Sequence, residues 1–450
     1  MQETDEPLQI PTPVRADQGK TKGDSVLMER SNSVLRRDVL QEKNELGEKL
    51  IIVMVGLPAR GKSYISKKLN RYLSWLGFRC RVFNVGNRRR VLASLAKSES
   101  DSNLSFLSSG PLDPSEEWKE PSANLHDAKF FDPSNKDAQR WREKLAMESL
   151  EELILWLHAG GKIGILDATN STRERRKALF ERVSEEKNVQ CLFIESICTD
   201  GPVLAANIEM KLQGPDYINI PRERAFLDFK SRIQNYDKVY ESLGEEEEVQ
   251  KTPYIKMIDV GRKVISYNIQ GYLPSHCVFY LMQLHIADRQ IWITRHGESR
   301  YNVENRLGGD PNLTLTDPIL ANRTLETVES FGAGMFHITP IRQLNEIYSG
   351  SYENMTYDEF QEQYPEEFER RSRNKLLYRF PGAGGESYVD VIERLRPLII
   401  ELERLKEDVV ICTHNVVMRT LVSYFIGLPL DKMPSLDIPL HTVFQLRPTP

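Results

Sequence analysis

Short apolar runs alternate with stretches of helical periodicity along most of the chain. Residues 49–55 (KLIIVMV) form an almost continuous apolar run, typical of a strand buried on both faces of a sheet. The spacing that follows predicts a helix over 62–76, and Gly77 is placed to end it. Further strands are expected at 80–85, 162–166 and 189–196, and further helices at 138–158 and 172–186. This alternation predicts a parallel sheet with helices on both faces.

A second set of elements begins near Arg289. The pattern predicts a buried strand at 291–294, a long helix at 386–406 and another strand at 408–413. The fold class is therefore α/β, with two domains that meet around 286–290.

The domain boundaries follow from changes in composition. Residues 1–46, rich in charge, Pro, Ser and Gln, are expected to be a disordered leader. The first domain is then 47–288 and the second is 289–450. Within the first domain, the Ser/Pro/Glu-rich stretch 98–135 is expected to be a flexible insertion, and 245–248 an exposed acidic loop.

Composition narrows the class of protein. With 40% hydrophobic and 28% charged residues, the 450-residue chain has the balance of a soluble globular protein. Its net charge of −5 gives no overall attraction for nucleic acid or for an anionic membrane. The N-terminus has no hydrophobic signal segment, and the five cysteines form no CxxC pair, which argues against secretion, disulfides and structural zinc. We expect a cytoplasmic protein without nucleic-acid or membrane partners.

The segment between the first strand and the first helix carries the clearest chemical signal. Residues 56–63 (GLPARGKS) fit the pattern G-x-x-x-x-G-K-[ST]. Glycines allow backbone N–H groups to close around phosphate oxygens, and the helix N-terminus adds partial positive charge. Lys62 can reach the β- and γ-phosphates, and the Ser63 hydroxyl can ligate Mg²⁺. The alternative to a phosphate-binding loop is a glycine-rich turn that only links strand and helix.

Other polar residues follow predicted strand ends, where ligands gather in open α/β sheets. Asp167 can hold Mg²⁺ or orient an acceptor hydroxyl, or it can simply cap a helix. Two basic clusters, 88–90 and 173–176, also follow strands. Basic runs are commonly solvated helix faces, but at this edge some of these arginines should face a phosphorylated acceptor.

A second site is expected in the second domain. His296, within Arg295-His296-Gly297-Glu298, and His414, within Thr413-His414-Asn415, both follow buried strands. Two histidines at parallel strand ends can converge on one phosphoryl group, one of them as the nucleophile. Arg323 would complete the phosphate pocket, and Glu346 is a candidate acid for the leaving oxygen.

Nine motifs together identify a family. They are GLPARGKSYISKKL (56–69), LDATNSTRERR (166–176), FIESIC (193–198), GPDY (214–217), RHGESxxNxxxRxGGDxxLT (295–314), LNEI (344–347), ENMTY (353–357), YPEEF (364–368) and PLHTV (439–443). From about residue 48 to its end, the chain resembles the bifunctional 6-phosphofructo-2-kinase/fructose-2,6-bisphosphatase family. The resemblance implies a P-loop kinase domain followed by a histidine-phosphatase domain of the phosphoglycerate-mutase-like class.

The resemblance also implies roles for residues of the kinase domain. Those expected to bind ATP are Gly56, Leu57, Pro58, Ala59, Arg60, Gly61, Lys62, Ser63, Tyr64, Asn207 and Lys211. Lys62, Asp167 and Cys198 match active-site positions, with Mg²⁺ at Ser63 and Asp167. Those expected to hold fructose 6-phosphate are Arg90, Arg142, Thr169, Arg175, Lys211, Arg232 and Tyr236.

In the phosphatase domain, the resemblance makes His296 the residue that becomes phosphohistidine and Glu346 the proton donor. Arg295, Asn302 and His414 would stabilise the transferring phosphoryl group. Those expected to bind fructose 2,6-bisphosphate are Gly308, Arg323, Tyr357, Arg371, Lys375, Tyr388, Asn415 and Arg419.

The chain departs from the family pattern before Arg323. The family usually has a helix and a further strand between Leu313 and Arg323, and here only 314–322 intervenes. Loss of a strand from a parallel core opens a cavity or exposes a sheet edge. The family's Gln after the second histidine is also replaced, by Asn415.

We therefore predict an enzyme that makes and hydrolyses fructose 2,6-bisphosphate. One alternative is a protein in which only the kinase works, and another is a non-catalytic regulator that binds ATP or sugar phosphates. A homodimer is possible on this interpretation. Ser33, three residues after Arg30, fits the pattern of a target for a basophilic protein kinase, and an unmodified tail is the alternative.

Overall fold

The computed structural model describes Leu40, Asn44 and residues 47–99, 128–314, 323–332 and 336–447. All of these except Leu40 belong to one compact unit of the chain, Lys43–Pro450. Ser33, most of the predicted leader and the middle of the predicted insertion lie outside the described residues.

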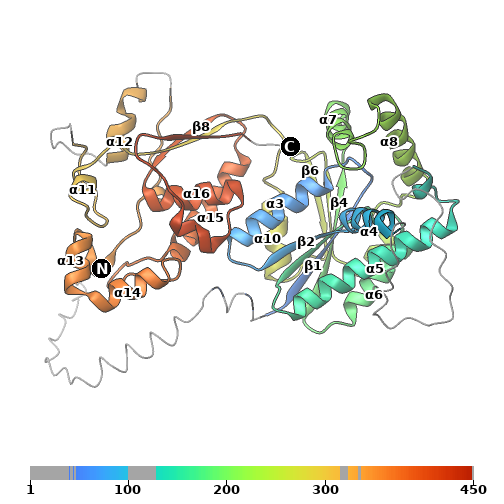
Figure 1. The fold of residues 1–450 in the computed structure, drawn as a ribbon, viewed down its shortest axis with the longest axis horizontal. Coiled ribbons are helices and arrows are strands. Elements are labelled where there is room, and N and C mark those ends of the chain that lie inside the picture. Colours follow the sequence, from blue (N-terminus) through green and yellow to red (C-terminus); the bar gives the residue numbers. More distant parts are fainter. Residues whose placement is uncertain are drawn as a thin grey trace, which may run out of the picture. The chain divides into compact units, whose positions relative to one another are not determined.

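The first domain is built on a six-stranded sheet with the order β2-β3-β1-β4-β5-β6 (Figure 1). The strands are β1 (Lys49–Val55), β2 (Cys80–Asn84), β3 (Ile163–Asp167), β4 (Val189–Ile197), β5 (Tyr254–Ile258) and β6 (Lys263–Tyr267). Strands β1 to β5 are parallel and β6 is antiparallel to β5. The parallel sheet predicted from the sequence is confirmed, whereas its fifth parallel strand β5 and the antiparallel edge strand β6 were not predicted.

Helices cover both faces of this sheet because alternate residues of its strands point to opposite sides. On β1, Leu50, Ile52 and Met54 pack in the cluster that contains α3 and α10, and Ile51 and Val53 pack in the cluster that contains α5 and α6. The helices of this domain are α3 (Lys62–Trp75), α4 (Val85–Glu99), α5 (Lys136–His158), α6 (Arg173–Ser184), α7 (Gly201–Leu212), α8 (Arg222–Asp237), α9 (Glu245–Val249), α10 (Tyr272–Leu281) and the 3₁₀ helix η1 (Ala128–Phe131).

The second domain has a sheet of three described strands, in the order β8-β7-β9. They are β7 (Ile291–Arg295), β8 (Val409–Thr413), parallel to β7, and β9 (Val443–Leu446), antiparallel to it. The helices are α11 (Arg300–Val303), α12 (Arg323–Val328), α13 (Tyr357–Gln363), α14 (Pro365–Arg373), α15 (Tyr388–Arg404) and α16 (Asn415–Ile426). Five-residue or shorter 3₁₀ segments are η2 (Glu329–Gly332), η3 (Arg342–Leu344) and η4 (Gly350–Tyr352), and η5 (Leu430–Ser435) is longer. Among the described residues no strand pairs with the outer side of β8, which agrees with the sheet edge expected from the short 314–322 segment.

Two predictions for loops are corrected by the structure. The acidic stretch 245–248 is not an exposed loop but the start of α9, because Glu247 is buried and lies 2.6 Å from Arg176 Nη2. The stretch predicted as a flexible insertion is ordered at both ends: α4 continues to Glu99, and η1 places Phe130 and Phe131 in a buried cluster. The end that contains η1 is ordered because its two phenylalanine side chains are buried, although the segment around them is mostly polar.

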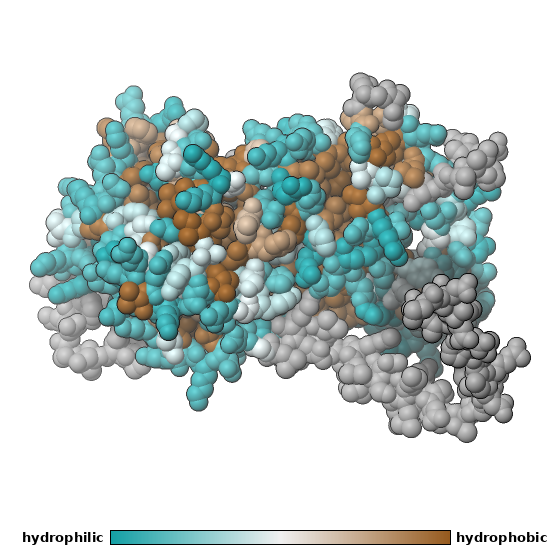
Figure 2. All heavy atoms as spheres, turned by 180° about the vertical axis from the view of Figure 1, so that it is seen from behind, coloured by the Kyte–Doolittle hydropathy of each residue, from teal (hydrophilic) through white to brown (hydrophobic). Residues whose placement is uncertain are grey.

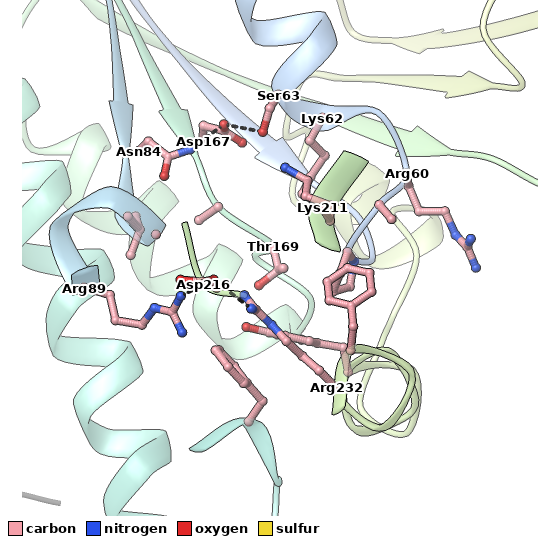
Figure 3. Close-up of a pocket in the computed structure, with 18 of the residues that line it drawn as sticks. Arg60, Lys62, Ser63, Asn84, Arg89, Asp167, Thr169, Lys211, Asp216 and Arg232 are labelled. Carbon is pink, nitrogen blue, oxygen red and sulfur yellow. Dashed lines mark hydrogen bonds and ion pairs between the residues drawn. The ribbon is translucent and has the colours of Figure 1, made fainter. Parts of the chain in front are cut away.

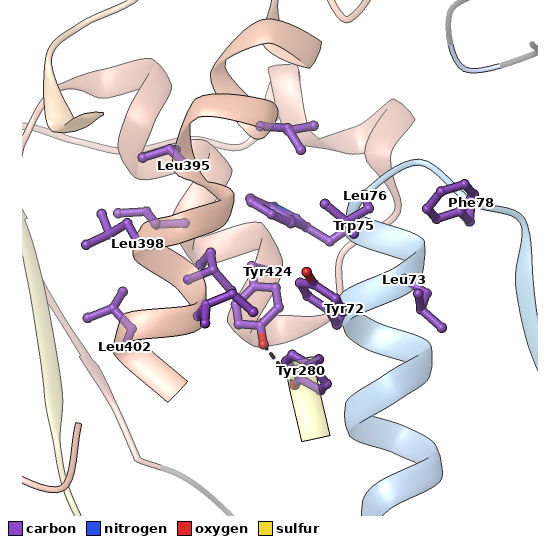
Figure 4. Packing of buried hydrophobic residues seen from close by; sticks show 14 of the residues in the cluster. Tyr72, Leu73, Trp75, Leu76, Phe78, Tyr280, Leu395, Leu398, Leu402 and Tyr424 are labelled. Atoms are coloured by element: carbon purple, nitrogen blue, oxygen red, sulfur yellow. Dashed lines mark hydrogen bonds between the residues drawn. The ribbon is translucent and has the colours of Figure 1, made fainter. Parts of the chain in front are cut away.

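Helix α3, which starts at the glycine-rich turn, packs against α16, which starts beside His414. Tyr72 of α3 stacks on Tyr280 of α10, with ring centroids 4.2 Å apart, and Trp75 meets Tyr424 of α16 edge-on (Figure 4). The Trp75 indole N–H donates to the Thr420 carbonyl oxygen at 3.1 Å. The helices that begin at the two candidate sites therefore share one apolar core.

Polar side chains cover much of the face drawn in Figure 2, with apolar patches between them. On α10, Tyr272 and Phe279 are more than half exposed. In the described part of the chain, no helix has both the length and the apolar character needed to cross a bilayer.

Candidate active sites

The turn after β1 adopts a conformation that suits phosphate oxygens. Gly56 and Gly61 both have positive φ angles, 135° and 88°. A Cβ atom on Gly56 would lie 2.6 Å from the Ser196 carbonyl oxygen, so only glycine fits there. Gly61 is the N-cap of α3, and the free N–H groups of the helix therefore face the turn. The predicted sequence of strand, turn and helix is confirmed.

Three polar side chains meet where β3 ends beside this turn. Ser63 Oγ donates to Asp167 Oδ2 at 2.9 Å, and Asn84 Nδ2 donates to the same oxygen at 2.7 Å (Figure 3). The alternative role of Asp167 as a helix cap is wrong, because Thr172 is the N-cap of α6. A hydroxyl and a carboxylate oxygen form the kind of donor set that Mg²⁺ takes, with phosphate and water completing its shell. Across the described residues no group of three His, Cys, Asp or Glu side chains could hold a metal alone.

Lys62 lies at the bottom of the turn. Its Nζ donates to the Leu57 carbonyl oxygen at 2.6 Å, and the residue is 8% exposed. Burial lowers the pKa of Lys62 to about 7; Asp167 opposes this shift, and Lys211 and Arg232 add to it. A bound phosphate would supply the negative charge that keeps this ammonium group protonated.

The turn opens into a cavity of about 460 Å³ whose charged lining residues are mostly cations. Asp167 and Asp216 are the two carboxylates in its lining. The basic residues in the lining are Arg60, Lys62, Lys67, Arg89, Arg90, Arg142, Arg175, Lys211 and Arg232. Such an excess of positive charge in a concave site favours ligands with several negative charges.

His296 and His414 lie together at the edge of the second sheet. Strands β7 and β8 are parallel, with Arg295 in register with Thr413, so the next residue of each emerges at the same edge. The two imidazole centroids are 5.1 Å apart, and the residues are 2% and 3% exposed. The two histidines therefore lie next to each other, as the strand pattern predicts, and their joint action on one phosphoryl group stays a prediction.

Hydrogen bonds determine which ring nitrogens carry protons. His296 Nδ1 lies 2.6 Å from the Gly297 carbonyl oxygen, which only accepts, so this nitrogen donates and Nε2 keeps its lone pair. Arg323 donates to His414 Nδ1 from Nε and Nη2, at 3.1 and 2.9 Å. Burial and the charge of Arg323 lower the pKa of His296 to about 3 and that of His414 to about 2. Both rings are therefore neutral at physiological pH, and His296 Nε2 can act as a nucleophile.

Glu346 lines the same cavity as His296. Its carboxylate accepts from the backbone N–H of Ile347 at 2.9 Å and of Val416 at 3.2 Å. Burial raises the pKa of Glu346, although these N–H groups and Arg323 act against the shift. A carboxyl group that holds its proton more strongly than usual suits a proton donor.

Comparison with known proteins covers almost the whole chain. Residues 37–288, more than half of the chain, match the family model for 6-phosphofructo-2-kinase. Residues 321–450 match the histidine phosphatase superfamily (branch 1). The chain belongs to the 6-phosphofructo-2-kinase/fructose-2,6-bisphosphatase family. As a member of a kinase family it uses a nucleotide.

Individual relatives differ in their names and lengths. Saccharomyces cerevisiae 6-phosphofructo-2-kinase 1 is 43% identical over 92% of this chain, which spans 52% of that relative's length. Rattus norvegicus 6-phosphofructo-2-kinase/fructose-2,6-bisphosphatase 4 is 39% identical over 88% of this chain and 82% of its own. A solved structure, Bacillus stearothermophilus YhfR, covers 35% of this chain and 90% of its own, with 30% identity and a TM-score of 0.31.

Most residues that the resemblance to this family assigns to the kinase site line the first cavity. They are Pro58, Ala59, Arg60, Gly61, Lys62, Ser63, Tyr64, Arg90, Arg142, Asp167, Thr169, Arg175, Asn207, Lys211, Arg232 and Tyr236. Gly56 and Leu57 do not line it and lie at the base of the turn. Cys198 Sγ, beyond the end of β4, lies 3.8 Å from the Asp200 carbonyl oxygen, and the structure does not bring it into the cavity.

The second cavity, of about 240 Å³, contains nearly all residues assigned to the phosphatase site. They are Arg295, His296, Asn302, Gly308, Arg323, Glu346, Tyr357, Arg371, Lys375, Tyr388, Asn415 and Arg419. His414 is absent from the lining; it is buried, and its Nδ1 accepts hydrogen bonds from Arg323, which does line the cavity. The position predicted for Arg323 at the phosphate pocket therefore agrees with the geometry, despite the short segment before it.

Among the residues of this family member's kinase cavity that sequence reasoning did not assign are Asn84, Arg89, Phe131 and Asp216. A signal existed for Arg89, in the cluster 88–90, and for Asp216, in the GPDY motif. Asn84 and Phe131 reach the cavity through tertiary packing, and their local sequence gave no sign of it.

Proposed function

We propose that the first domain transfers the γ-phosphoryl group of ATP to O2 of fructose 6-phosphate, and that the second domain hydrolyses the resulting fructose 2,6-bisphosphate. The observation that supports this most directly is one cavity whose lining contains both the glycine-rich turn and nine basic side chains, two of them from the turn itself. A nucleotide triphosphate and a sugar phosphate both carry the charge that such a cavity would bind.

In the kinase step the protein acts mainly by positioning and by charge. The N–H groups of the turn and Lys62 hold the β- and γ-phosphates, while Asn207 and Lys211, on α7, lie near the nucleotide. Arg90, Arg142 and Arg232 hold the sugar phosphate so that its 2-hydroxyl can approach the γ-phosphorus in line. The loose transition state of phosphoryl transfer needs no strong general base.

Ser63 and Asp167 would hold Mg²⁺ in this proposal. When bound, the ion would neutralise charge on the phosphate oxygens. Asp167 receives hydrogen bonds from Asn84 and Ser63, which orient its carboxylate toward the turn.

In the phosphatase step, His296 Nε2 attacks the phosphorus at position 2 of the bisphosphate. The bond to the sugar oxygen breaks, and Glu346 gives that oxygen its proton. Water then attacks the phosphorus of the phosphohistidine and gives a proton to Glu346. The bond between phosphorus and His296 Nε2 breaks, and inorganic phosphate leaves. Arg295 and Arg323 balance the charge of the phosphoryl group during transfer.

A protein with kinase activity alone is the second candidate. The histidine-phosphatase match starts at residue 321 and so leaves out Arg295, His296 and Gly297. The name of the yeast relative gives only the kinase activity. The neutral His296 with a free Nε2 favours the bifunctional proposal over this candidate.

Two measurements on the purified full chain test the proposal. The first is ATP consumption that depends on fructose 6-phosphate and is lost in Lys62→Met. The second is trapping of a phosphoenzyme from fructose 2,6-bisphosphate labelled at position 2, with His296→Ala as the control. Kinase turnover without a trapped label would favour the kinase-only candidate, and absence of both activities would leave only a binding role.

The boundaries 47–288 and 289–450, a homodimer, a cytoplasmic location and modification of Ser33 stay predictions.

A further inference from the structure

One carboxylate lies among the cations of the first cavity. Asp216 Oδ2 accepts from Arg89 Nη2 at 2.6 Å and from Arg232 Nη1 at 3.3 Å, and Oδ1 lies 3.5 Å from Arg90 Nη1 (Figure 3). The exposed fractions of the side chains are 11% for Asp216, 4% for Arg89, 16% for Arg232 and 27% for Arg90. A single buried anion therefore faces three guanidinium groups.

The three arginines come from two helices, and the turn that carries Asp216 has hydrogen bonds of its own. Arg89 and Arg90 lie on α4, Arg232 lies on α8, and Asp216 lies in the turn that follows α7. In that turn the Tyr217 N–H donates to the Gly214 carbonyl oxygen at 3.0 Å, and the Tyr217 hydroxyl donates to Asp228 at 2.8 Å. The carboxylate is thus a fixed point onto which two helices direct their cations.

Phe131 supports the same arrangement from another side. Its ring lies 3.9 Å from the Arg232 guanidinium carbon and 5.1 Å from that of Arg89. Stacking on an aromatic face leaves the N–H groups at the edge of a guanidinium free for hydrogen bonds. Arg232 Nε is buried and has no hydrogen-bond partner among the described residues.

We propose that Asp216 is a positioning residue of the sugar-phosphate subsite, which holds Arg89, Arg90 and Arg232 together as a preformed cradle for the phosphate of the acceptor. This inference rests on the proposed kinase function. It gives a role to the GPDY motif.

Two opposite effects follow from removing this carboxylate. The cavity gains positive charge, which favours anions in general, but three crowded cations lose the group that holds them together. Burial and Arg232 already lower the pKa of Arg89, and Asp216 acts against that shift. The second effect is the larger one, because a buried charge that loses its partner is costly and cations that separate no longer match the phosphate oxygens.

The test compares Asp216→Asn with Asp228→Asn. Asp228 undergoes the same chemical change beside the same turn, but its oxygens accept from the Tyr217 hydroxyl and the Ala128 N–H rather than from arginines. An asparagine amide can keep both contacts, because the Tyr217 hydroxyl can accept as well as donate. Binding of fructose 6-phosphate and of ATP is measured separately by isothermal titration calorimetry, and KM and kcat are measured by turnover. Asp216→Glu tests whether restoring the charge restores binding.

We expect Asp216→Asn to weaken fructose 6-phosphate binding and raise its KM about tenfold to a hundredfold. For Asp216→Asn, the ATP affinity and kcat at saturation should stay within about threefold of the values for the unmodified protein. For Asp228→Asn, all of the measured values should stay within that range. Asp216→Glu should recover part of the lost fructose 6-phosphate affinity. Equal or tighter sugar-phosphate binding by Asp216→Asn would overturn the inference, as would an equal loss in Asp228→Asn or a parallel loss of ATP binding. Unmodified protein that binds fructose 6-phosphate without phosphorylating it would contradict the proposed function, and the calorimetric comparison would still decide the role of Asp216.

Discussion

Replacement of Glu403 by Gln should destabilise the protein strongly, because this carboxylate is buried where α3 packs against α15 and α16. Its oxygens lie 2.9 Å from Lys68 Nζ and 2.8 Å from Arg71 Nη2, and the Tyr424 hydroxyl donates to it at 2.5 Å. Arg289 Nη2 lies 3.8 Å away. The Glu403 side chain is 2% exposed, and those of Lys68, Arg71 and Arg289 are 13%, 21% and 5% exposed.

The size of the effect follows from this burial. Removing one partner of a buried ion pair costs about 3–5 kcal/mol, since the remaining charges stay out of water without compensation. Gln keeps the shape and can still accept a hydrogen bond, so we expect the lower value, about 3 kcal/mol. For a domain of this size that is a fall in melting temperature of about 6–12 °C.

The matched control is Glu401→Gln on the same helix. Glu401 is 45% exposed and pairs with Arg404 at 2.6 Å, a surface pair that should contribute less than about 1 kcal/mol. Urea unfolding followed by tryptophan fluorescence, to which Trp75 and the four other tryptophans contribute, would measure both variants at pH 7. A loss for Glu403→Gln no larger than that for Glu401→Gln would refute the assigned energy.

The pH dependence gives a second check. Burial acts to raise the pKa of Glu403, but Lys68 and Arg71 outweigh it and hold the pKa below its usual range. A lowered pKa in the folded state stabilises the protein fully above the unfolded pKa of about 4.3, and this stability is lost as the pH falls through the folded pKa. The difference in the free energy of unfolding between the unmodified protein and Glu403→Gln should therefore become smaller below about pH 4.

Three further predictions concern the two sites. Because the pKa of Lys62 without bound nucleotide is about 7, ATP affinity should fall as the pH rises from 6 to 8. Measured by calorimetry, Lys62→Met should bind ATP more weakly and with less dependence on pH. An unchanged dependence of ATP affinity on pH in this variant would contradict the role of Lys62. His296→Ala should abolish the trapped phosphoenzyme while kinase turnover stays within about twofold, and label retained in that variant would place the nucleophile elsewhere. Gly56→Ala should lower the free energy of unfolding by about 1–3 kcal/mol and remove most ATP binding, because its Cβ would meet the Ser196 carbonyl oxygen. The control Gly201→Ala, which has open space around it, should leave the melting temperature nearly unchanged.

The parts of the fold that the sequence predicts are those with strong local signals. β1 is a continuous apolar run because it is buried on both faces, and the GLPARGKS motif marks both its end and the start of α3. The antiparallel strands β6 and β9 were missed, because each pairs at a sheet edge and carries a mixed apolar and polar pattern. Glu247 looks exposed in the sequence, and only the distant Arg176 explains its burial.

The candidate sites show the same limit. Lys62, Asp167, His296 and His414 follow predicted strands, so topology alone brings them to the sheet edges. Asp216 is more than a hundred residues from Arg89 in the sequence and sixteen residues from Arg232. No periodic pattern in the sequence predicts contacts at such separations.

The central claim is that one cavity receives ATP and fructose 6-phosphate and passes a phosphoryl group between them. The most direct measurement follows the label of γ-³²P-ATP with time in the presence of fructose 6-phosphate, Mg²⁺ and the purified protein. We predict that label appears first in fructose 2,6-bisphosphate and later in inorganic phosphate, and that Lys62→Met prevents both. Label that reaches inorganic phosphate without passing through the sugar, or that never leaves ATP, would contradict the account.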